Sequence, residues 1–258
     1  MFVPGATVNV NRPRLVDGSL RRWSFRLLPA TCLLCGQAGD LAIDLCKACA
    51  SELPWQGPCC QRCALPLPLA STACGRCLSR PPAFDRAITA FRYEWPLDTL
   101  IARLKFAADL AAGRVLAELL ASRIEAELAQ SSLPRPQAIV PVPLHRQRLA
   151  ERGFNQALEL AEPLAKRLAL PIARGALIRE RATLAQTGLD AKSRRRNLRG
   201  ALLAPGELAG RHLALVDDVI TTSATAQECA RALKKAGAAS VQVWALARAE
   251  SARGGVKS

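Results

Sequence analysis

The chain has 258 residues, and 50% of them are apolar, so it is long enough for one α/β domain with its own core and a small additional module. It contains no run of about 18 apolar residues, and its first ten residues lack the pattern of a signal peptide, so we expect no transmembrane segment and a cytoplasmic protein. The formal net charge of +15 favours phosphate-rich partners, either nucleic acid or a polyphosphate ligand, although a solvated basic face is the simpler alternative.

The first part of the chain is predicted to be an extension that leads into a cysteine-rich segment. Residues 1–18 have no apolar periodicity, whereas residues 19–28 have the spacing of a short amphipathic helix. Pro81 and Pro82 mark a boundary after the cysteines. The predicted organisation is therefore an N-terminal extension at 1–28, a cysteine-rich module at 29–80 and a larger domain at 84–250.

The cysteine-rich module has the spacing of a double zinc ribbon. Nine of the ten cysteines lie between positions 32 and 77, and eight of them form four C-x2-C pairs. Each pair places two thiolates at one tetrahedral metal ion, and two pairs close a four-cysteine zinc site with no open position for catalysis. Disulfides are not expected in a cytoplasmic protein. We therefore expect two structural zinc ions, bound by Cys32, Cys35, Cys46, Cys49, Cys60, Cys63, Cys74 and Cys77.

Two partitions of these ligands fit the spacing. Consecutive pairing gives one site from the first two pairs and a second site from the last two, whereas a cross-braced arrangement joins alternate pairs. Consecutive pairing is the simpler prediction. Cys59 remains spare, and Cys229 lies in a predicted helix, where a small buried hydrophobic side chain is expected rather than a nucleophile.

The segment after the cysteines alternates predicted strands and helices. Apolar runs predict strands at 86–92, 138–143, 212–217 and 241–247. Apolar residues three and four apart predict helices at 97–106, 110–128, 154–168 and 224–236. This alternation predicts an α/β fold, a doubly wound parallel sheet with helices on both faces. The polar, basic stretch 178–200 predicts a mobile loop that closes over a phosphate ligand.

Three arginines follow the predicted strand at 138–143. Arg146, Arg148 and Arg152 are expected at the carboxyl end of that strand, where guanidinium groups suit diphosphate oxygens. The alternative is that they belong to a solvated first helical turn, and for Arg148 the two interpretations carry equal weight. The whole stretch 135–199 holds 14 lysines and arginines against 5 acidic residues, so it is the expected basic face for nucleic acid. No role is assigned to His145.

The most informative stretch runs from 209 to 225. An apolar run ends in two acidic residues, and a hydroxyl-rich loop then leads into a predicted helix. A helix N-terminus favours phosphate through its free N–H groups and its dipole, and paired carboxylates accept hydrogen bonds from vicinal sugar hydroxyls. The implied ligand is a sugar phosphate, held by Asp217, Asp218 and the loop residues Thr221, Thr222, Ser223, Ala224 and Thr225. The alternative is a surface turn whose polar side chains only cap the helix.

This stretch resembles the signature with which type I phosphoribosyltransferases bind phosphoribosyl diphosphate (PRPP). The resemblance implies that Asp217 and Asp218 bind the ribose hydroxyls and form the catalytic pair if the protein is active. It also implies that residues 221–225 wrap the 5′-phosphate. Arg146 and Arg152 are the expected diphosphate ligands. Ser223 departs from the pattern, because this position is most often glycine, which adopts a left-handed φ without strain.

Together the motifs resemble the ComF family of competence proteins over residues 25–250. They are the four C-x2-C pairs, the stretches 141–144 and 152–156, the series Thr183, Gln186, Arg194 and Asn197, and the loop that begins at Asp217. The resemblance implies a small cysteine-rich zinc module followed by a type I phosphoribosyltransferase-like α/β domain. It also implies PRPP as a ligand, with Mg²⁺ if the protein is active. The implied partners are single-stranded DNA and the competence machinery, which the protein meets in the cytoplasm or at the periphery of the inner membrane.

Two functions fit these features. In the first, a ComF-type protein with a PRPP-binding fold acts in the uptake or handling of transforming single-stranded DNA, and the charge of +15 favours this hypothesis. With 4 Trp, 1 Tyr and 6 Phe, the chain lacks the aromatic residues of a base-stacking platform, so DNA contacts are expected mainly at phosphates. In the alternative, the chain is an active phosphoribosyltransferase in nucleotide or nutrient metabolism, and positioned charges stabilise the departing diphosphate. The sequence identifies neither an acceptor nor turnover.

Overall fold

The computed structural model describes residues 10–11, 30–39, 43–107, 109–179 and 201–249. The helix predicted at 19–28 lies outside these residues, as do nearly all of the loop predicted at 178–200 and the motif residues Thr183, Gln186, Arg194 and Asn197. Among the described helices, none is both long enough and apolar enough to cross a membrane.

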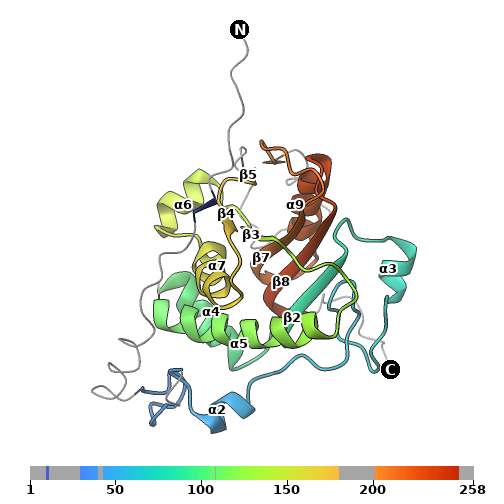
Figure 1. Cartoon of the computed structure of the whole chain (residues 1–258). Helices are drawn as coiled ribbons and strands as arrows, with labels where there is room; N and C mark the ends of the chain where they lie inside the picture. Colours follow the sequence, from blue (N-terminus) through green and yellow to red (C-terminus); the bar gives the residue numbers. More distant parts are fainter. Residues whose placement is uncertain (1–9, 12–29, 40–42, 108, 180–200, 250–258) are drawn as a thin grey trace.

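A six-stranded sheet forms the centre of the described part of the chain (Figure 1). Its strands run in the order β1, β4, β3, β7, β8, β2, and every neighbouring pair is parallel except β1 with β4. The bounds are Val10–Asn11 (β1), Arg86–Arg92 (β2), Ala138–Pro141 (β3), Ile172–Ala173 (β4), His212–Ile220 (β7) and Ser240–Arg248 (β8). A separate antiparallel pair joins β5 (Ile178–Arg179) to β6 (Leu202–Leu203). The predicted α/β fold with a parallel sheet is confirmed.

Helices cover both faces of this sheet, as predicted (Figure 1). One face carries α4 (Leu97–Phe106), α5 (Leu110–Ala129) and α7 (Gln156–Arg167), whose apolar residues share one core cluster. The other face carries α9 (Ala224–Lys235), which packs in a second cluster. A short helix, α6 (Arg146–Arg152), follows β3. Two more short helices, α2 (Lys47–Ser51) and α3 (Gly75–Ser79), belong to the cysteine-rich module.

The central strands are apolar along most of their length because both of their faces are covered. On β7, Leu213 and Leu215 are buried on the α9 side, whereas Ala214 and Val216 are buried on the side of α5 and α7. Successive side chains of a strand point to opposite faces, so a strand covered on both sides has a continuous apolar run rather than an alternation. This is why the run at 212–217 could be assigned to a buried strand from the sequence.

The predicted strands and helices of the α/β domain are all present, with shifts at their ends. β7 continues to Ile220, beyond the predicted end at 217, because Ile220 still pairs with Arg248 of β8. The expectation of a loose extension at 1–18 is wrong at Val10–Asn11, which forms β1 and pairs with β4. The strands β1, β4, β5 and β6 contain 2 residues each, too few for a periodic pattern.

The cysteine-rich module lies across the edge strand β2. The segment between its two halves pairs with this strand: the N–H of Gln56 donates to the carbonyl of Ala90 at 2.8 Å, and the N–H of Arg92 donates to the carbonyl of Pro54 at 2.8 Å. One half of the module contributes buried residues to the core cluster on the α5 side, and the other half contributes to the cluster on the α9 side. The module therefore covers a sheet edge that would otherwise expose unpaired backbone groups, and it reaches both faces of the sheet.

Candidate functional site

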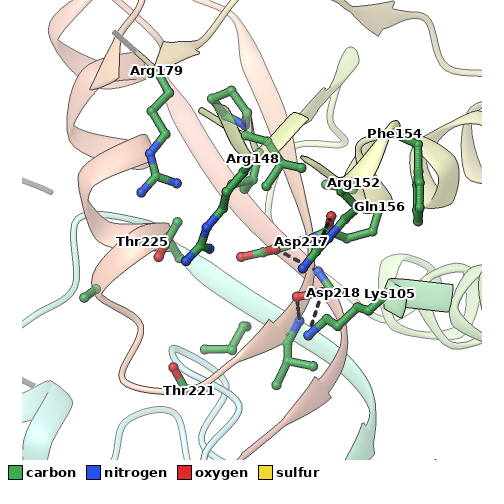
Figure 2. A pocket seen from close by; sticks show the side chains of 18 of the residues that line it. Lys105, Arg148, Arg152, Phe154, Gln156, Arg179, Asp217, Asp218, Thr221 and Thr225 are labelled. Carbon is green, nitrogen blue, oxygen red and sulfur yellow. Dashed lines mark hydrogen bonds and ion pairs between the residues drawn. The ribbon is translucent and has the colours of Figure 1, made fainter. Parts of the chain in front are cut away.

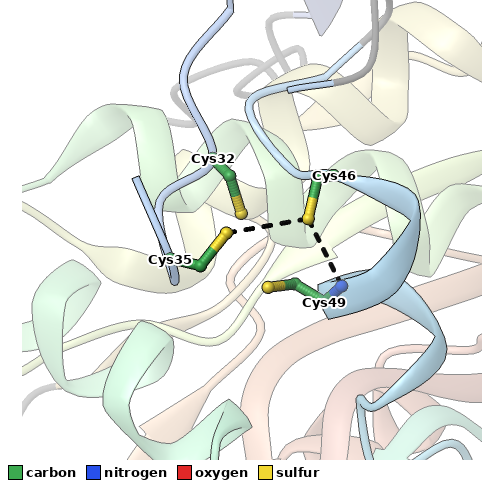
Figure 3. A group of neighbouring side chains, drawn as sticks. All are labelled: Cys32, Cys35, Cys46 and Cys49. Atoms are coloured by element: carbon green, nitrogen blue, oxygen red, sulfur yellow. Dashed lines mark hydrogen bonds between the residues drawn. The ribbon is translucent and has the colours of Figure 1, made fainter. Parts of the chain in front are cut away.

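The eight paired cysteines form two clusters, which we call the first and the second zinc site. The four Sγ atoms of each cluster lie within 4.8 Å of one another. The first site contains Cys32, Cys35, Cys46 and Cys49 (Figure 3), and the second contains Cys60, Cys63, Cys74 and Cys77. The predicted consecutive pairing is confirmed, and the cross-braced alternative is wrong.

The donor set of each cluster fits zinc. Four thiolates at such distances are the ligands of a tetrahedral structural site, which leaves no position open for catalysis. Backbone N–H groups also donate to the sulfurs, from Cys49 to Cys46 Sγ at 3.4 Å and from Cys74 to Cys60 Sγ at 3.1 Å. Such hydrogen bonds favour the thiolate form that binds the metal. The two clusters therefore have the chemistry of structural zinc sites.

The cysteines differ in burial. All four cysteines of the second site are buried, whereas Cys35 of the first site is exposed and Cys46 and Cys49 are half-buried. Cys59 belongs to neither site. Cys229 is fully buried in α9, and burial raises the pKa of its thiol, so the group stays protonated and is not an activated nucleophile.

A cavity of about 780 Å³ opens at the carboxyl ends of β3 and β7 (Figure 2). After β3, the next strand of the sheet in the chain is β4, which lies on one side of β3. After β7, the next strand is β8, which lies on the opposite side. The gap between the ends of β3 and β7 is therefore a topological switch point, the place where open parallel sheets bind their ligands.

Most of the predicted site residues line this cavity. They are Asp217, Asp218, Thr221, Ser223, Ala224, Thr225 and Arg152. Arg148, for which the sequence left two interpretations, also lines it. Arg146 and Thr222 are not among the lining residues: Arg146 is exposed at the start of α6, and the Thr222 carbonyl accepts a hydrogen bond from Arg76 at 3.2 Å. All three predicted arginines are helical, yet two of them still face the cavity.

The acidic pair lies near the end of β7. Backbone N–H groups hold both side chains: that of Asp218 donates to Asp217 Oδ1 at 2.9 Å, and that of Val219 donates to Asp218 Oδ1 at 2.6 Å. Burial, and then the neighbouring charge of Asp218, raise the pKa of Asp217. A half-buried carboxyl group with a raised pKa beside a like charge is typical of a ligand site rather than of a group that stabilises the fold.

Lys105 contacts Asp218 of the acidic pair, and no pattern in the sequence predicts this contact. Its side chain extends from α4, and its Nζ lies 2.8 Å from Asp218 Oδ2 (Figure 2). The lysine is far from β7 in the sequence and occupies an ordinary polar position of an amphipathic helix, so no local pattern marks it. This ion pair compensates the charge of Asp218.

Ser223 has the backbone conformation that would favour glycine at this position. Its φ is 61° and its ψ is 10°, in the left-handed region, and its buried side chain makes no capping hydrogen bond. The helix-capping alternative is therefore wrong for Ser223. Strained conformations of this kind cost about 1–3 kcal/mol each and are concentrated at functional sites. The first N–H groups of α9 have no acceptor within the helix, so they suit an anion.

Three arginines from two elements line the cavity. Arg148 and Arg152 come from α6, and Arg179 comes from the end of β5 (Figure 2). Arg179 is 8% exposed, and burial, followed by the positive charge of Arg148, lowers its pKa. Arg152 donates from Nη1 to Gln156 Oε1 at 2.9 Å, and its guanidinium carbon lies 5.6 Å from the centre of the Phe106 ring. Like charges held beside one cavity favour an anionic ligand.

The cysteine-rich segment and a large part of the chain both match known proteins. Residues 25–78 match the model of the double zinc ribbon domain. Competence protein F of Haemophilus influenzae is 38% identical over 175 residues, which are 67% of this chain and 76% of that protein. DNA utilization protein YhgH of Escherichia coli K12 is 39% identical over 171 residues, 66% of this chain and 75% of that protein. The protein of the same name from Salmonella typhi is 38% identical over 217 residues, 84% and 89% of the two chains.

The comparison with solved structures gives a weaker likeness. A structure described as that of the allosteric regulatory enzyme of purine biosynthesis is 24% identical, with a TM-score of 0.32, and the match covers 52% of this chain and 25% of that chain. At this TM-score the likeness carries no argument. Assignment to a family therefore depends on the sequence relatives.

Proposed function

Because the chain belongs to the ComF family of competence proteins, we propose that its cavity binds a phosphorylated sugar, expected to be PRPP, and that the protein acts in the handling of transforming single-stranded DNA. One observation carries the ligand proposal: an acidic pair, a strained loop at a helix N-terminus and a group of arginines meet in a single cavity. Each of these groups suits a different part of a sugar that bears both a phosphate and a diphosphate.

The chemistry of each group assigns it to one part of the ligand. Asp217 suits the vicinal ribose hydroxyls, which donate hydrogen bonds to a carboxylate. The N-terminus of α9, with the hydroxyl groups of Thr221 and Thr225, suits the 5′-phosphate. Arg148 and Arg179 suit the diphosphate, whose negative charge offsets their repulsion. Arg146, expected from the sequence as a diphosphate ligand, is outside the cavity lining, so we assign this role to Arg148.

Mg²⁺ is proposed as the companion of the diphosphate, on the chemistry of the donors. Carboxylate and phosphate oxygens are the ligands that Mg²⁺ prefers, and Asp217 is the carboxyl group for that role, since Asp218 is ion-paired with Lys105. When bound, the ion would neutralise negative charge on the diphosphate. The other ligand contacts come from side chains of the protein: Arg148 and Arg179 hold the diphosphate oxygens, and Asp217 orients the ribose.

The DNA part of the proposal is supported by the names of the relatives and by the basic surface beside the cavity. In the basic stretch 135–199, Arg167 and Arg174 are ion-paired with glutamates of α5 and α7, so these arginines add little net charge. Arg146 of α6 is exposed, and among the described residues it forms no ion pair. The surface of α6 is therefore one described surface that suits DNA phosphates.

The second candidate is an active phosphoribosyltransferase without a DNA role. The neighbouring positive charges of Arg148 and Arg179 favour this enzyme, because cations beside a departing diphosphate stabilise the negative charge that develops on the diphosphate. This candidate predicts that PRPP is consumed in the presence of a suitable amine or base, whereas a protein that only binds PRPP leaves it intact.

Titration of the full chain with PRPP, with and without Mg²⁺, tests the ligand proposal. The wild type should bind, and Asp217→Asn should lose binding because an amide cannot ionise to the carboxylate that accepts hydrogen bonds from the ribose hydroxyls. Glu207→Gln is the matched control, since it removes an exposed acid that does not line the cavity. Binding that survives Asp217→Asn would contradict the ligand proposal.

Salt titration of single-stranded DNA binding tests the DNA proposal. Affinity for unrelated sequences should be similar and should fall by about 0.7 log units per log unit of salt for each neutralised phosphate. Arg146→Ala should make this slope shallower while PRPP affinity is kept, because Arg146 is exposed and outside the cavity lining. Absence of DNA binding at low salt, together with consumption of PRPP, would favour the enzyme.

A further inference from the structure

Arg248, at the carboxyl end of β8, is a buried cation behind the loop 221–225, which we call the phosphate loop. It is 2% exposed. Its Nη1 shares its two hydrogens among three carbonyl oxygens, those of Ile220 at 2.8 Å, of Ala249 at 2.9 Å and of Thr221. Ile220 and Thr221 are the residues through which β7 passes into the phosphate loop. One guanidinium group therefore ties the start of this loop to the end of β8.

Arg76 holds the next carbonyl of the phosphate loop, that of Thr222. It lies on α3 between two ligands of the second zinc site, and its Nη2 donates to the carbonyl of Thr222 at 3.2 Å. The carbonyls of 220–222 are thus all bonded to arginines. Because a trans peptide unit is planar, the N–H of each following residue points away from the carbonyl. The N–H groups of residues 221–223 therefore point away from the two arginines. A backbone that binds an anion in the cavity needs its N–H groups in this direction.

A buried arginine needs a compensating negative charge. Within the part of the chain that the structure describes, no ion pair joins Arg248 to a carboxylate. Burial and the like charge of Arg76 lower the pKa of Arg248, whereas the charges of Cys63, Cys74 and Cys77 raise it. These cysteines belong to the second zinc site, and four thiolates around one divalent ion carry a net negative charge.

We propose that the second zinc site sets the backbone of the phosphate loop. Arg76, which lies between two ligands of this site, and Arg248 hold the carbonyls of 220–222 in place. Arg248 is then a positioning residue: it does not line the cavity, but it orients the groups that do. Occupancy of the second site by zinc controls the affinity of the cavity for phosphate. The first site packs against the other face of the sheet, so its occupancy should matter less. This inference rests on the proposed ligand function.

Stepwise removal of zinc from the wild-type chain tests the dependence on metal. The first site contains the exposed Cys35, so a chelator should remove its zinc first. The affinity for inorganic pyrophosphate, measured by calorimetry, should persist until the second zinc leaves and then fall about tenfold, as expected for the loss of roughly one charged hydrogen bond. A fall that follows the first zinc, or an affinity unchanged after both ions are lost, overturns the proposal.

Matched variants separate this coupling from unfolding. Arg248→Lys keeps the charge, but its side chain ends one bond short of Nη1, the atom that reaches the three carbonyls. Cys74→Ser removes a ligand of the second site, and Cys46→Ser removes one of the first. Amide hydrogen exchange at 220–226 should be faster in Arg248→Lys and Cys74→Ser but not in Cys46→Ser. Unchanged protection in α5 shows that the domain remains folded. Protection at 220–226 that is equal in Arg248→Lys and the wild type overturns the proposal.

Failure of the proposed function gives a different pattern of results. If the wild type binds neither pyrophosphate nor PRPP, the ligand proposal fails, and the exchange comparison still decides whether Arg248 positions the loop. If the wild type binds and Arg248→Lys binds equally well, the ligand proposal stands and the coupling through Arg248 is wrong.

Discussion

Replacing Arg148 by alanine should weaken ligand binding and, at the same time, stabilise the ligand-free protein. Arg148 lines the cavity with the buried Arg179, and after burial its charge is the next cause of the lowered pKa of Arg179. The two guanidinium groups therefore repel each other in the free protein. A bound diphosphate would accept charge-assisted hydrogen bonds from both, and the repulsion would be offset.

The expected change in stability applies to the ligand-free protein, and the expected change in affinity applies to the ligand-bound protein. Relief of unfavourable charge contacts typically stabilises a protein by about 0.5–2 kcal/mol, so Arg148→Ala should raise the free energy of unfolding of the ligand-free protein by an amount in this range. Hydrogen bonds to charged groups contribute about 1.5–3 kcal/mol. Loss of one such bond to the ligand should therefore raise the Kd for PRPP about 10- to 150-fold.

Arg146→Ala is the matched control, because it removes the same charge from the same helix at an exposed position outside the cavity lining. Calorimetric titration with PRPP and urea unfolding, carried out on both variants, measure the two effects. Arg146→Ala should change the free energy of unfolding by less than about 0.5 kcal/mol and leave the Kd nearly unchanged. Equal loss of PRPP affinity in both variants, or a destabilised Arg148→Ala protein, would refute the reasoning.

Three other measurements test the zinc sites, the strained loop and the acidic pair. Metal analysis should give close to two zinc ions for the wild type and one for Cys46→Ser, and an unchanged content would contradict two separate sites. Ser223→Gly should raise the free energy of unfolding by up to about 1 kcal/mol, whereas the β-branched variant Ser223→Val should lower it by about 1–2 kcal/mol. The opposite order would mean that the φ of residue 223 is not left-handed in solution. Because the folded-state pKa of Asp217 is raised, the wild type should lose stability as the pH rises from about 4 through that pKa. Asp217→Asn should lack this loss, so melting curves of the two proteins should converge at low pH; parallel pH profiles would contradict the raised pKa.

The helices and long strands of the α/β domain could be predicted because burial leaves local patterns in the sequence. α4 was expected at 97–106 because its apolar residues recur three and four apart, and Leu97, Leu100, Ile101 and Leu104 are indeed buried. The short strands β1 and β4 could not be predicted, because they are defined by pairing with each other and with β3 rather than by a pattern of their own.

The same contrast holds at the site. The acidic pair and the phosphate loop are contiguous in the chain, so their chemistry could be inferred from one stretch. Lys105 reaches the cavity only through the tertiary fold, and no local signal marks it. Arg179 lies at the start of the basic stretch that was expected to close over a phosphate, but nothing in that stretch distinguishes it from the other arginines. Helical spacing was the missed signal for the arginines. Residues four apart share a helix face and residues two apart do not, so Arg148 and Arg152 face the cavity together while Arg146 does not.

The cavity brings together three arrangements that oppose folding stability: the acidic pair, the repelling arginines and the left-handed Ser223. A surface turn that only capped α9 would need none of them. Such strain persists only where the surrounding structure over-determines the local conformation. Arg248 and Arg76 provide this restraint, since they hold the carbonyls of 220–222 from the side opposite the ligand. Because Arg76 lies between two ligands of the second zinc site, this restraint gives the site a role beyond folding of its own module.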